Sequence, residues 1–209
     1  MTSPRRFRVT WEKTISSADA AVFYDLYHAA FSPLATLSAV RQVLRRDEFD
    51  EEMADERVEK LVAWDDDGVA VGLTILTGTL SAMPWISPEF YAARYPEHAA
   101  RGAIYYVAFT LAHPTMRGTG AYVTMLDTLI ERLTAERAVC VYDICAYNND
   151  SIHFADHLQK RALRTAELTV EVLDVQTFYG AEFHGTRAPL VEAPAPSLVI
   201  AERSFAGRH

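Results

Sequence analysis

Hydrophobic and polar positions near the N-terminus predict one strand followed by two helices. Weak alternation over residues 7–14 indicates a strand. Ser16 or Ser17 then precedes apolar residues at helical spacing, which makes either serine a suitable N-cap, and this helix is expected to end at Ser32, before a proline. A second helix is expected over residues 36–59, with apolar residues on one face and an acidic continuation.

The middle of the chain shows the patterns of a hairpin, a buried strand and an amphipathic helix. Alternating residues over 60–76 flank a turn of three aspartates and Gly68, which predicts a β-hairpin. Residues 103–112 form a continuous apolar run, as in a central strand that is buried on both faces. After Gly120, a helix is predicted by apolar residues at helical spacing with polar residues opposite: Val123, Leu126, Leu129, Ile130 and Leu133.

The remaining segments predict two more strands, one helix and a long loop. Residues 138–146 again resemble a buried strand, a turn rich in capping residues leads to a helix over 152–162, and residues 168–178 form a final long strand. Residues 78–102 interrupt these patterns with prolines and aromatic residues. A loop of this length in a compact domain is usually functional or disordered, and the aromatic content favours a functional one.

The predicted elements follow the order strand, helix, helix, three strands, helix, strand, helix, strand. This order gives a mixed sheet covered by helices, which is an α/β fold of mixed α+β character. The chain has 209 residues, enough for one large domain, which we place at residues 1–185. Residues 186–209 form a C-terminal tail, in which residues 197–200 could add an edge strand.

Composition and charge exclude several classes of partner. The net charge of −8 argues against nucleic acid, because proteins that bind it carry basic patches. There is no apolar run of about 18 residues and no secretory pattern at the N-terminus, so we expect no membrane partner and a cytoplasmic location. Cys140 and Cys145 should lie on opposite faces of a strand as free thiols. The acidic run over residues 47–56 could attract a cationic amine or could simply be a solvated helix face.

The most informative motif is a glycine-containing turn between the central strand and the helix that follows it. The turn reads Arg117-Gly118-Thr119-Gly120-Ala121-Tyr122. Glycines allow close approach of a ligand to the backbone, and the first amides of a helix have no internal acceptor, so such a turn can hold a phosphate or pyrophosphate. It lacks the Gly-Lys-Ser/Thr of a Walker loop and the third glycine of a dinucleotide fingerprint. An ordinary strand-to-helix turn is the alternative.

This turn resembles the coenzyme A loop of the GNAT superfamily of acyl-CoA-dependent N-acyltransferases. That family carries Arg or Gln, any two residues, Gly, any residue, and then Gly or Ala, between its fourth strand and third helix. Here Arg117 to Tyr122 occupy the six positions, and Tyr122 replaces the final small residue. The predicted order of elements over residues 7–185 is also that of the GNAT fold.

The resemblance implies transfer of an acetyl or other acyl group from acyl-CoA to the amine of a small molecule or peptide. It implies acetyl-CoA as co-substrate and no metal. The acyl-CoA would lie along the ends of the fourth and fifth strands. The implied cofactor-binding residues are Phe109, Thr110, Leu111, Arg117, Gly118, Thr119, Gly120, Ala121, Tyr122, Val123, Asn148 and Ser151. Asn148 is explained equally well as a capping residue before a helix.

Candidate catalytic residues are few. The tyrosine with which the family protonates the departing thiolate is replaced here by Ala155. Asp143, expected in the middle of a buried strand, is the candidate base, although a structural, hydrogen-bonded role is the alternative. Tyr147 is a candidate replacement acid that could equally serve packing.

The acceptor amine would bind against residues 78–102 and the loop between the first two helices. Trp85, Phe90 and Tyr91 are the expected residues of the acceptor pocket. A homodimer is compatible with this fold. The alternative function is a non-catalytic acyl-CoA-binding or interaction module on the same fold, which the residues at 122 and 155 favour.

Overall fold

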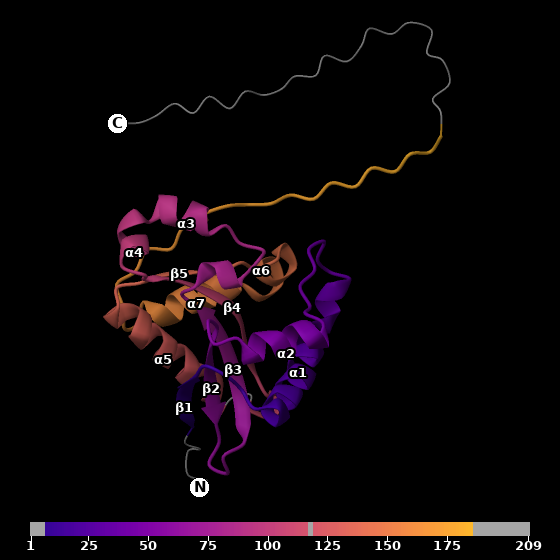
Figure 1. Ribbon diagram of the computed structural model, residues 1–209. Helices are drawn as coiled ribbons and strands as arrows, with labels where there is room; N and C mark the ends of the chain where they lie inside the picture. Colours follow the sequence, from indigo (N-terminus) through magenta and orange to yellow (C-terminus); the bar gives the residue numbers. More distant parts are fainter. Residues whose placement is uncertain (1–6, 117–118, 186–209) are drawn as a thin grey trace, which may run out of the picture. The chain divides into compact units, whose positions relative to one another are not determined.

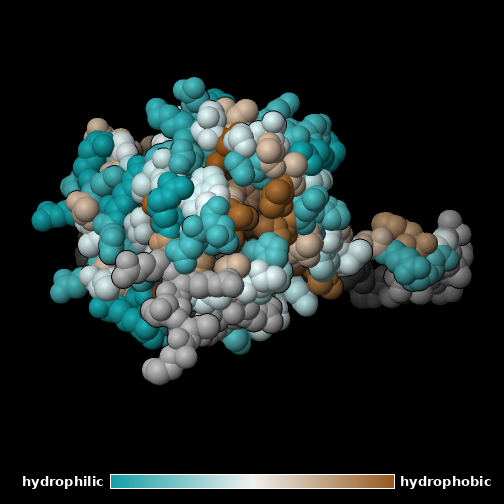
Figure 2. Space-filling model, turned by 90° about the horizontal axis from the view of Figure 1, so that it is seen from below, coloured by the Kyte–Doolittle hydropathy of each residue, from teal (hydrophilic) through white to brown (hydrophobic). Residues whose placement is uncertain are grey.

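The computed structural model describes residues 7–116 and 119–185 (Figure 1). The chain divides into two units, residues 1–173 and residues 174–209. Every helix and strand among the described residues belongs to the first unit. Hydrophilic residues cover most of the face seen in Figure 2, and hydrophobic residues gather there in a narrow band. Large apolar side chains such as Phe23, Leu61 and Leu73 are fully buried, as expected of a folded domain.

One mixed sheet organises the first unit. Its strands lie side by side in the order of the sequence, and the first four pair with one another in antiparallel fashion. The last two, β4 and β5, are parallel. The strands are β1 (Arg8–Glu12), β2 (Glu59–Trp64), β3 (Ala70–Thr77), β4 (Ile104–Ala112) and β5 (Val139–Val141). The mixed sheet and the predicted hairpin are thus confirmed.

Helices cover both faces of the sheet (Figure 1). On one face, α1 (Ser17–Phe31) and α2 (Arg46–Ala54) pack against the sheet through Phe23, Tyr27 and Phe49, all fully or almost fully buried. On the other face lies α5 (Ala121–Ala135). Successive strand residues point to opposite faces, so β2 contributes Val62 to the first core and its two neighbours to the second.

Local sequence signals explain where several helices begin. The Ser16 side chain accepts a hydrogen bond from the Asp19 amide at 3.1 Å and caps α1, as predicted. Ser87 caps a short helix, α3 (Pro88–Arg94), inside the aromatic segment, which also holds α4 (Pro96–Ala100) and a 3₁₀ turn, η2 (Leu80–Ala82). Further 3₁₀ turns are η1 (Ser32–Ala35) and η3 (Pro114–Met116).

The prediction of a helix over residues 36–59 was wrong. Only Arg46–Ala54 is helical, and residues 36–45 form a loop. The Tyr27 hydroxyl donates to the Gln42 carbonyl at 3.1 Å and accepts from the Leu44 amide at 3.0 Å. The buried Tyr27 side chain therefore provides hydrogen bonds to backbone groups that would otherwise be paired within a helix. These bonds stabilise residues 36–45 as a loop.

The C-terminal third also differs from the predictions. The strand expected over residues 138–146 ends at Val141. The helix expected over residues 152–162 is confirmed as α7 (Phe154–Ala162), but the turn expected before it is also helical, α6 (Ala146–Ile152). His153 separates them with a left-handed φ of 50°.

Residues 168–178 contain no strand in the part of the chain that the structure describes. Contacts of two side chains, rather than a strand ladder, hold residues 171–173 in place. Glu171 pairs with Arg94 at 2.7 Å, and Leu173 packs against the main core. The suggested edge strand at residues 197–200 lies outside the described residues.

Candidate functional site

The strands β4 and β5 separate soon after they meet. Their pairing covers only three positions and ends where Tyr106 lies beside Val141. Beyond that point β4 continues to Ala112, paired with β3 on its other side. Among the described residues, no strand covers the opposite edge of residues 107–112. Backbone groups along this edge are therefore available to a ligand.

A β-bulge lies in β4 just beyond the fork. Phe109 pairs with Ile75 and Val107 pairs with Leu76, so Ala108 is an extra residue without a partner on β3. A bulge bends its strand and frees the backbone groups of the extra residue, and bulges are common beside active sites. The bulge and the fork together give β4 an accessible backbone at this point.

The side chains of the three predicted strand residues are committed to packing. The Phe109 ring lies 4.9 Å from that of Tyr27, the Thr110 hydroxyl accepts from Thr74 at 3.2 Å, and Leu111 is buried in the core. Any contact of these three residues with a ligand beside β4 would therefore be made by their backbone.

The N-terminus of α5 presents free amides at the far end of β4. Gly120 has the left-handed φ of 96° and begins the helix without a side-chain cap. The first intrahelical bond runs from the Thr124 amide to the Gly120 carbonyl at 2.8 Å. The amides of residues 121–123 precede that bond and have no acceptor within the helix. The Thr119 amide instead donates to Met116 at 3.0 Å, and residues 117 and 118 lie outside the described residues.

Tyr122 directs its ring into the protein. The ring packs against two clusters, around Met125 and around Leu126, Ile130 and Ala162, and burial raises the pKa of its hydroxyl to about 12. A large residue at this motif position is therefore accommodated by packing against these two clusters.

Three residues from distant segments form a hydrogen-bonded chain at the fork. The Trp85 indole N–H donates to the Tyr106 hydroxyl at 2.9 Å, and that hydroxyl donates to Asp143. Tyr106 is 2% exposed, and burial raises the pKa of its hydroxyl strongly. Asp143 itself is exposed, because β5 ends at Val141, so the expectation of a buried, mid-strand aspartate was wrong.

Tyr106 was not among the candidate residues predicted from the sequence. The available signal was a tyrosine in a strand expected to be buried on both faces, since a buried hydroxyl requires a hydrogen-bond partner. Nothing in the sequence identified that partner.

The three candidate residues after β5 all lie on α6. Tyr147 is 46% exposed, Asn148 is partly buried, and the Ser151 hydroxyl donates to the Tyr147 carbonyl. The Ser151 hydroxyl therefore has a local acceptor in this structure.

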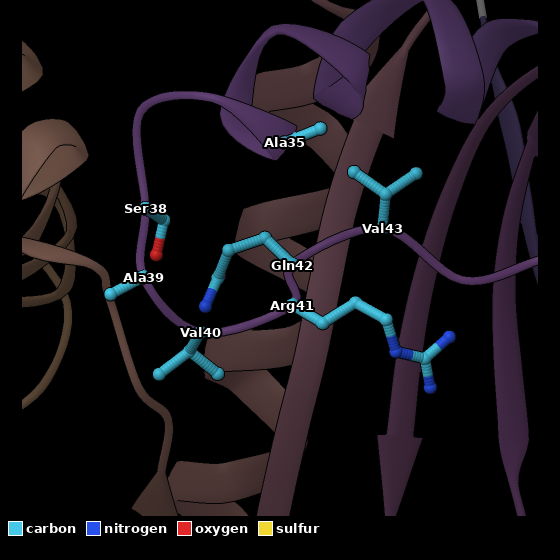
Figure 3. Close-up of a pocket in the computed structure, with 7 residues that line it drawn as sticks. All are labelled: Ala35, Ser38, Ala39, Val40, Arg41, Gln42 and Val43. Atoms are coloured by element: carbon cyan, nitrogen blue, oxygen red, sulfur yellow. The ribbon is translucent and has the colours of Figure 1, made fainter.

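The loop between α1 and α2 encloses a pocket of about 330 Å³ (Figure 3). In Figure 3 the Ser38 hydroxyl and the Gln42 amide point into the loop's concave side, whereas Arg41 points away. Arg41 is instead paired with Glu48, on α2. Ala35, Ala39, Val40 and Val43 complete the lining.

The predicted acceptor residues lie in the aromatic segment. Trp85 is 52% exposed and Phe90 is 44% exposed, and the Phe90 and Tyr91 rings meet edge to face at 5.3 Å. Trp85 is joined to the fork through Tyr106. The part of the chain described by the structure contains no group of three or more residues placed to hold a metal ion. It also contains no helix long and apolar enough to cross a membrane.

Comparison with known proteins shows a fold but no close relative. No protein-family model matches the sequence. No curated protein matches it either. A candidate acetyltransferase from Acinetobacter baylyi has a similar structure, with a TM-score of 0.50 and 17% identity over 76% of this chain and 79% of that one.

Two further structures are similar over most of this chain. One is a ribosomal-protein-alanine N-acetyltransferase from Brucella melitensis, with a TM-score of 0.49 and 17% identity over 83% of this chain and all of that one. The other is AAC(6')-Iy in complex with the bisubstrate analog CoA-S-monomethyl-acetylneamine, with a TM-score of 0.45 and 12% identity over 83% and 99% of the two chains.

Proposed function

Starting from the GNAT fold, which this chain adopts, we propose that the protein is an acyl-CoA-dependent N-acyltransferase. It would transfer an acetyl or other acyl group from acyl-CoA to the amine of a small molecule or peptide. One observation carries this proposal: the open edge of β4, beyond its fork with β5, leads to the free amides of α5. An extended thioester with a pyrophosphate at one end needs this combination of surfaces.

The acyl-CoA is proposed to lie along β4 with its phosphates at α5. The backbone of residues 109–111 would pair with the amide groups of the pantetheine arm. The amides of residues 121–123 would bind the pyrophosphate, favoured by the helix dipole. Arg117 and Gly118 remain predicted contributors.

The reaction then requires little of the side chains. The nitrogen lone pair attacks the thioester carbon, a C–N bond forms and the C–S bond breaks. Backbone amides at the Ala108 bulge are suitably free to stabilise the oxyanion. We propose that Asp143 accepts the proton lost by the amine, directly or through water.

Departure of the thiolate needs only weak help. Its pKa of about 8.5 makes it a good leaving group, so the reaction is compatible with Ala155. Tyr147, which is 46% exposed, is the proposed proton donor for any assistance.

The first prediction tests the cofactor site through Val123. Its side chain is 40% exposed in the first turn of α5, so Val123→Glu places a negative charge where the pyrophosphate would lie. An acidic residue there stabilises the helix, so lost binding would not reflect lost folding. We expect Val123→Glu to weaken acetyl-CoA binding at least about tenfold in calorimetry.

Val123→Gln is the matched control, because glutamine has nearly the same size and shape as glutamate but carries no charge. It should bind acetyl-CoA within about threefold of the unchanged protein. Absence of binding to the unchanged protein would overturn the proposal, as would equal binding by the two variants.

A non-catalytic acyl-CoA-binding module is the second candidate, and Ala155 is the observation that favours it. Both candidates predict binding, but only an enzyme releases CoA in an amine-dependent reaction. Binding without thiol release across a broad panel of amines would favour the module.

A further inference from the structure

In the hydrogen-bonded group of Trp85, Tyr106 and Asp143, the middle residue is buried and the two outer residues are accessible. Tyr106 is 2% exposed, whereas Trp85 is 52% exposed and Asp143 is also exposed. Both ends are bonded to the same phenolic oxygen, so the indole nitrogen and the carboxylate lie within two hydrogen-bond lengths of each other. The buried hydroxyl thus fixes an aromatic ring and a negative charge side by side at the surface.

Trp85 and Asp143 can each still contact a ligand. The indole is anchored through its N–H and meets the Tyr106 ring edge to face at 6.4 Å, so its orientation is fixed while half of it faces solvent. One carboxylate oxygen of Asp143 accepts from Tyr106, and the other has no hydrogen-bond partner among the described residues. A fixed aromatic face beside a carboxylate is suited to an organic ammonium ion.

This group of three residues lies close to the proposed site of the reaction. Tyr106 is the last residue of β4 that pairs with β5, and the bulge at Ala108 is two residues further on. Tyr106 also faces the same core as α1 and α2, whose connecting loop encloses the pocket of Figure 3. An amine held at the fork would therefore be next to the proposed position of the thioester.

We propose that Trp85 and Asp143, held in place by Tyr106, bind the acceptor, and that the acceptor is a primary amine carried on a flat, apolar group. The ammonium would bind the free oxygen of Asp143 and the apolar group would stack on Trp85. Tyr106 is a positioning residue, because it acts through its two neighbours. This inference rests on the proposed acyltransferase function and names its substrate class.

The chemical step balances with these groups. The bound ammonium releases one proton to water, which frees the lone pair that attacks the thioester. As the C–N bond forms, the second proton passes to the Asp143 carboxylate and then to water. The C–S electron pair leaves with sulfur, and the CoA thiolate takes its proton from solvent.

The test measures thiol release from acetyl-CoA with matched acceptors. 2-Phenylethylamine carries both proposed features, ethanolamine lacks the apolar group, and 2-phenylethanol lacks the amine. We expect a KM for 2-phenylethylamine at least tenfold below that for ethanolamine, and no release with 2-phenylethanol. Asp143→Asn, Tyr106→Phe and Trp85→Leu should each raise the KM for 2-phenylethylamine at least fivefold and leave the Kd of acetyl-CoA unchanged.

Trp11→Leu is the control, because it removes an indole from β1, at the opposite edge of the sheet. Trp85 lies on the surface, so its variant keeps the test informative even where Tyr106→Phe unfolds. If acetyl-CoA binds but ethanolamine is acetylated as well as 2-phenylethylamine, this inference alone is overturned. The same holds if acetyl-CoA binds and the Asp143 and Trp85 variants keep the KM of the unchanged protein. Failure of acetyl-CoA to bind would overturn the proposed function itself.

Discussion

Lys60 and Glu52, two ionisable residues near α2, both have buried polar groups, but only the Lys60 ammonium is fully hydrogen-bonded. Lys60 is fully buried, and its ammonium donates to the carbonyls of Lys13, Asp55 and Val58 at 2.7–2.8 Å, while burial lowers its pKa to about 8. Glu52, on α2, has a buried Oε1 with no hydrogen-bond partner among the described residues. Burial raises the pKa of the Glu52 carboxyl to about 7. The acidic run is therefore not wholly the solvated face that its composition suggested.

Glu52 should make the stability of the protein depend on pH. Its pKa is about 7 when folded and 4.5 as the reference value, so between these values only the unfolded state ionises. Stability is therefore full below pH 4.5 and falls as the pH rises to 7. Glu52→Gln should be more stable than the unchanged protein at pH 8 by about 1–3 kcal/mol, with little difference at pH 4.

Urea unfolding over this pH range measures the effect. Glu51→Gln, the exposed neighbour on α2, is the control and should keep the pH dependence of the unchanged protein. An identical pH slope in the two variants would show that Glu52 is solvated in the folded protein.

At the scale of elements, Gly72 marks a close contact between β3 and α5. A Cβ added to this residue of β3 would lie 2.6 Å from Cε of Met125, which is fully buried on α5. Gly72 also pairs with Ala112, the last residue of β4. The absence of a side chain here leaves room for the Met125 side chain between α5 and the sheet.

Gly72→Ala should consequently overpack this contact. We expect a loss of up to about 1 kcal/mol in the free energy of unfolding, since the atoms that must move are the flexible end of the Met125 side chain. Met125→Leu alone should cost under about 1.5 kcal/mol, and combining it with Gly72→Ala should recover part of the loss. A double-mutant cycle by urea unfolding measures this coupling, and strictly additive effects would contradict the proposed contact.

At the scale of the whole molecule, residues 167–173 contribute contacts to the first unit, and the structure describes no strand among them. Glu171 pairs with Arg94 and accepts from the Tyr95 hydroxyl at 2.8 Å, and Leu173 packs on the core. The proposed domain boundary at residue 185 keeps these contacts, whereas a boundary before residue 168 removes them.

Two shortened chains test that boundary. A chain ending at residue 185 should keep the unfolding midpoint and the acetyl-CoA affinity of the full chain. A chain ending at residue 166 should lose about 1–2 kcal/mol of stability, because it lacks the partly buried Leu173 side chain. Differential scanning calorimetry compares them, and a large loss in the longer chain would place the boundary further along the sequence.

The sequence by itself determined the elements whose signals are local. The β2–β3 hairpin, the long β4 and the amphipathic α5 each follow from periodic burial on one or both faces. The glycine turn before α5 follows from the conformation that Gly120 adopts. Such signals need only neighbouring residues, because a strand or helix repeats its contacts with a fixed period.

Only the tertiary structure decided how these elements make a candidate site. Asp143 and Tyr106 are 37 residues apart, and their hydrogen bond depends on where β5 ends. Likewise, the burial of the Tyr122 ring depends on α7, and the loop over residues 36–45 depends on a hydroxyl from α1. Each outcome is a competition between local propensity and contacts made across the fold, and the free energy of those contacts is absent from any local pattern.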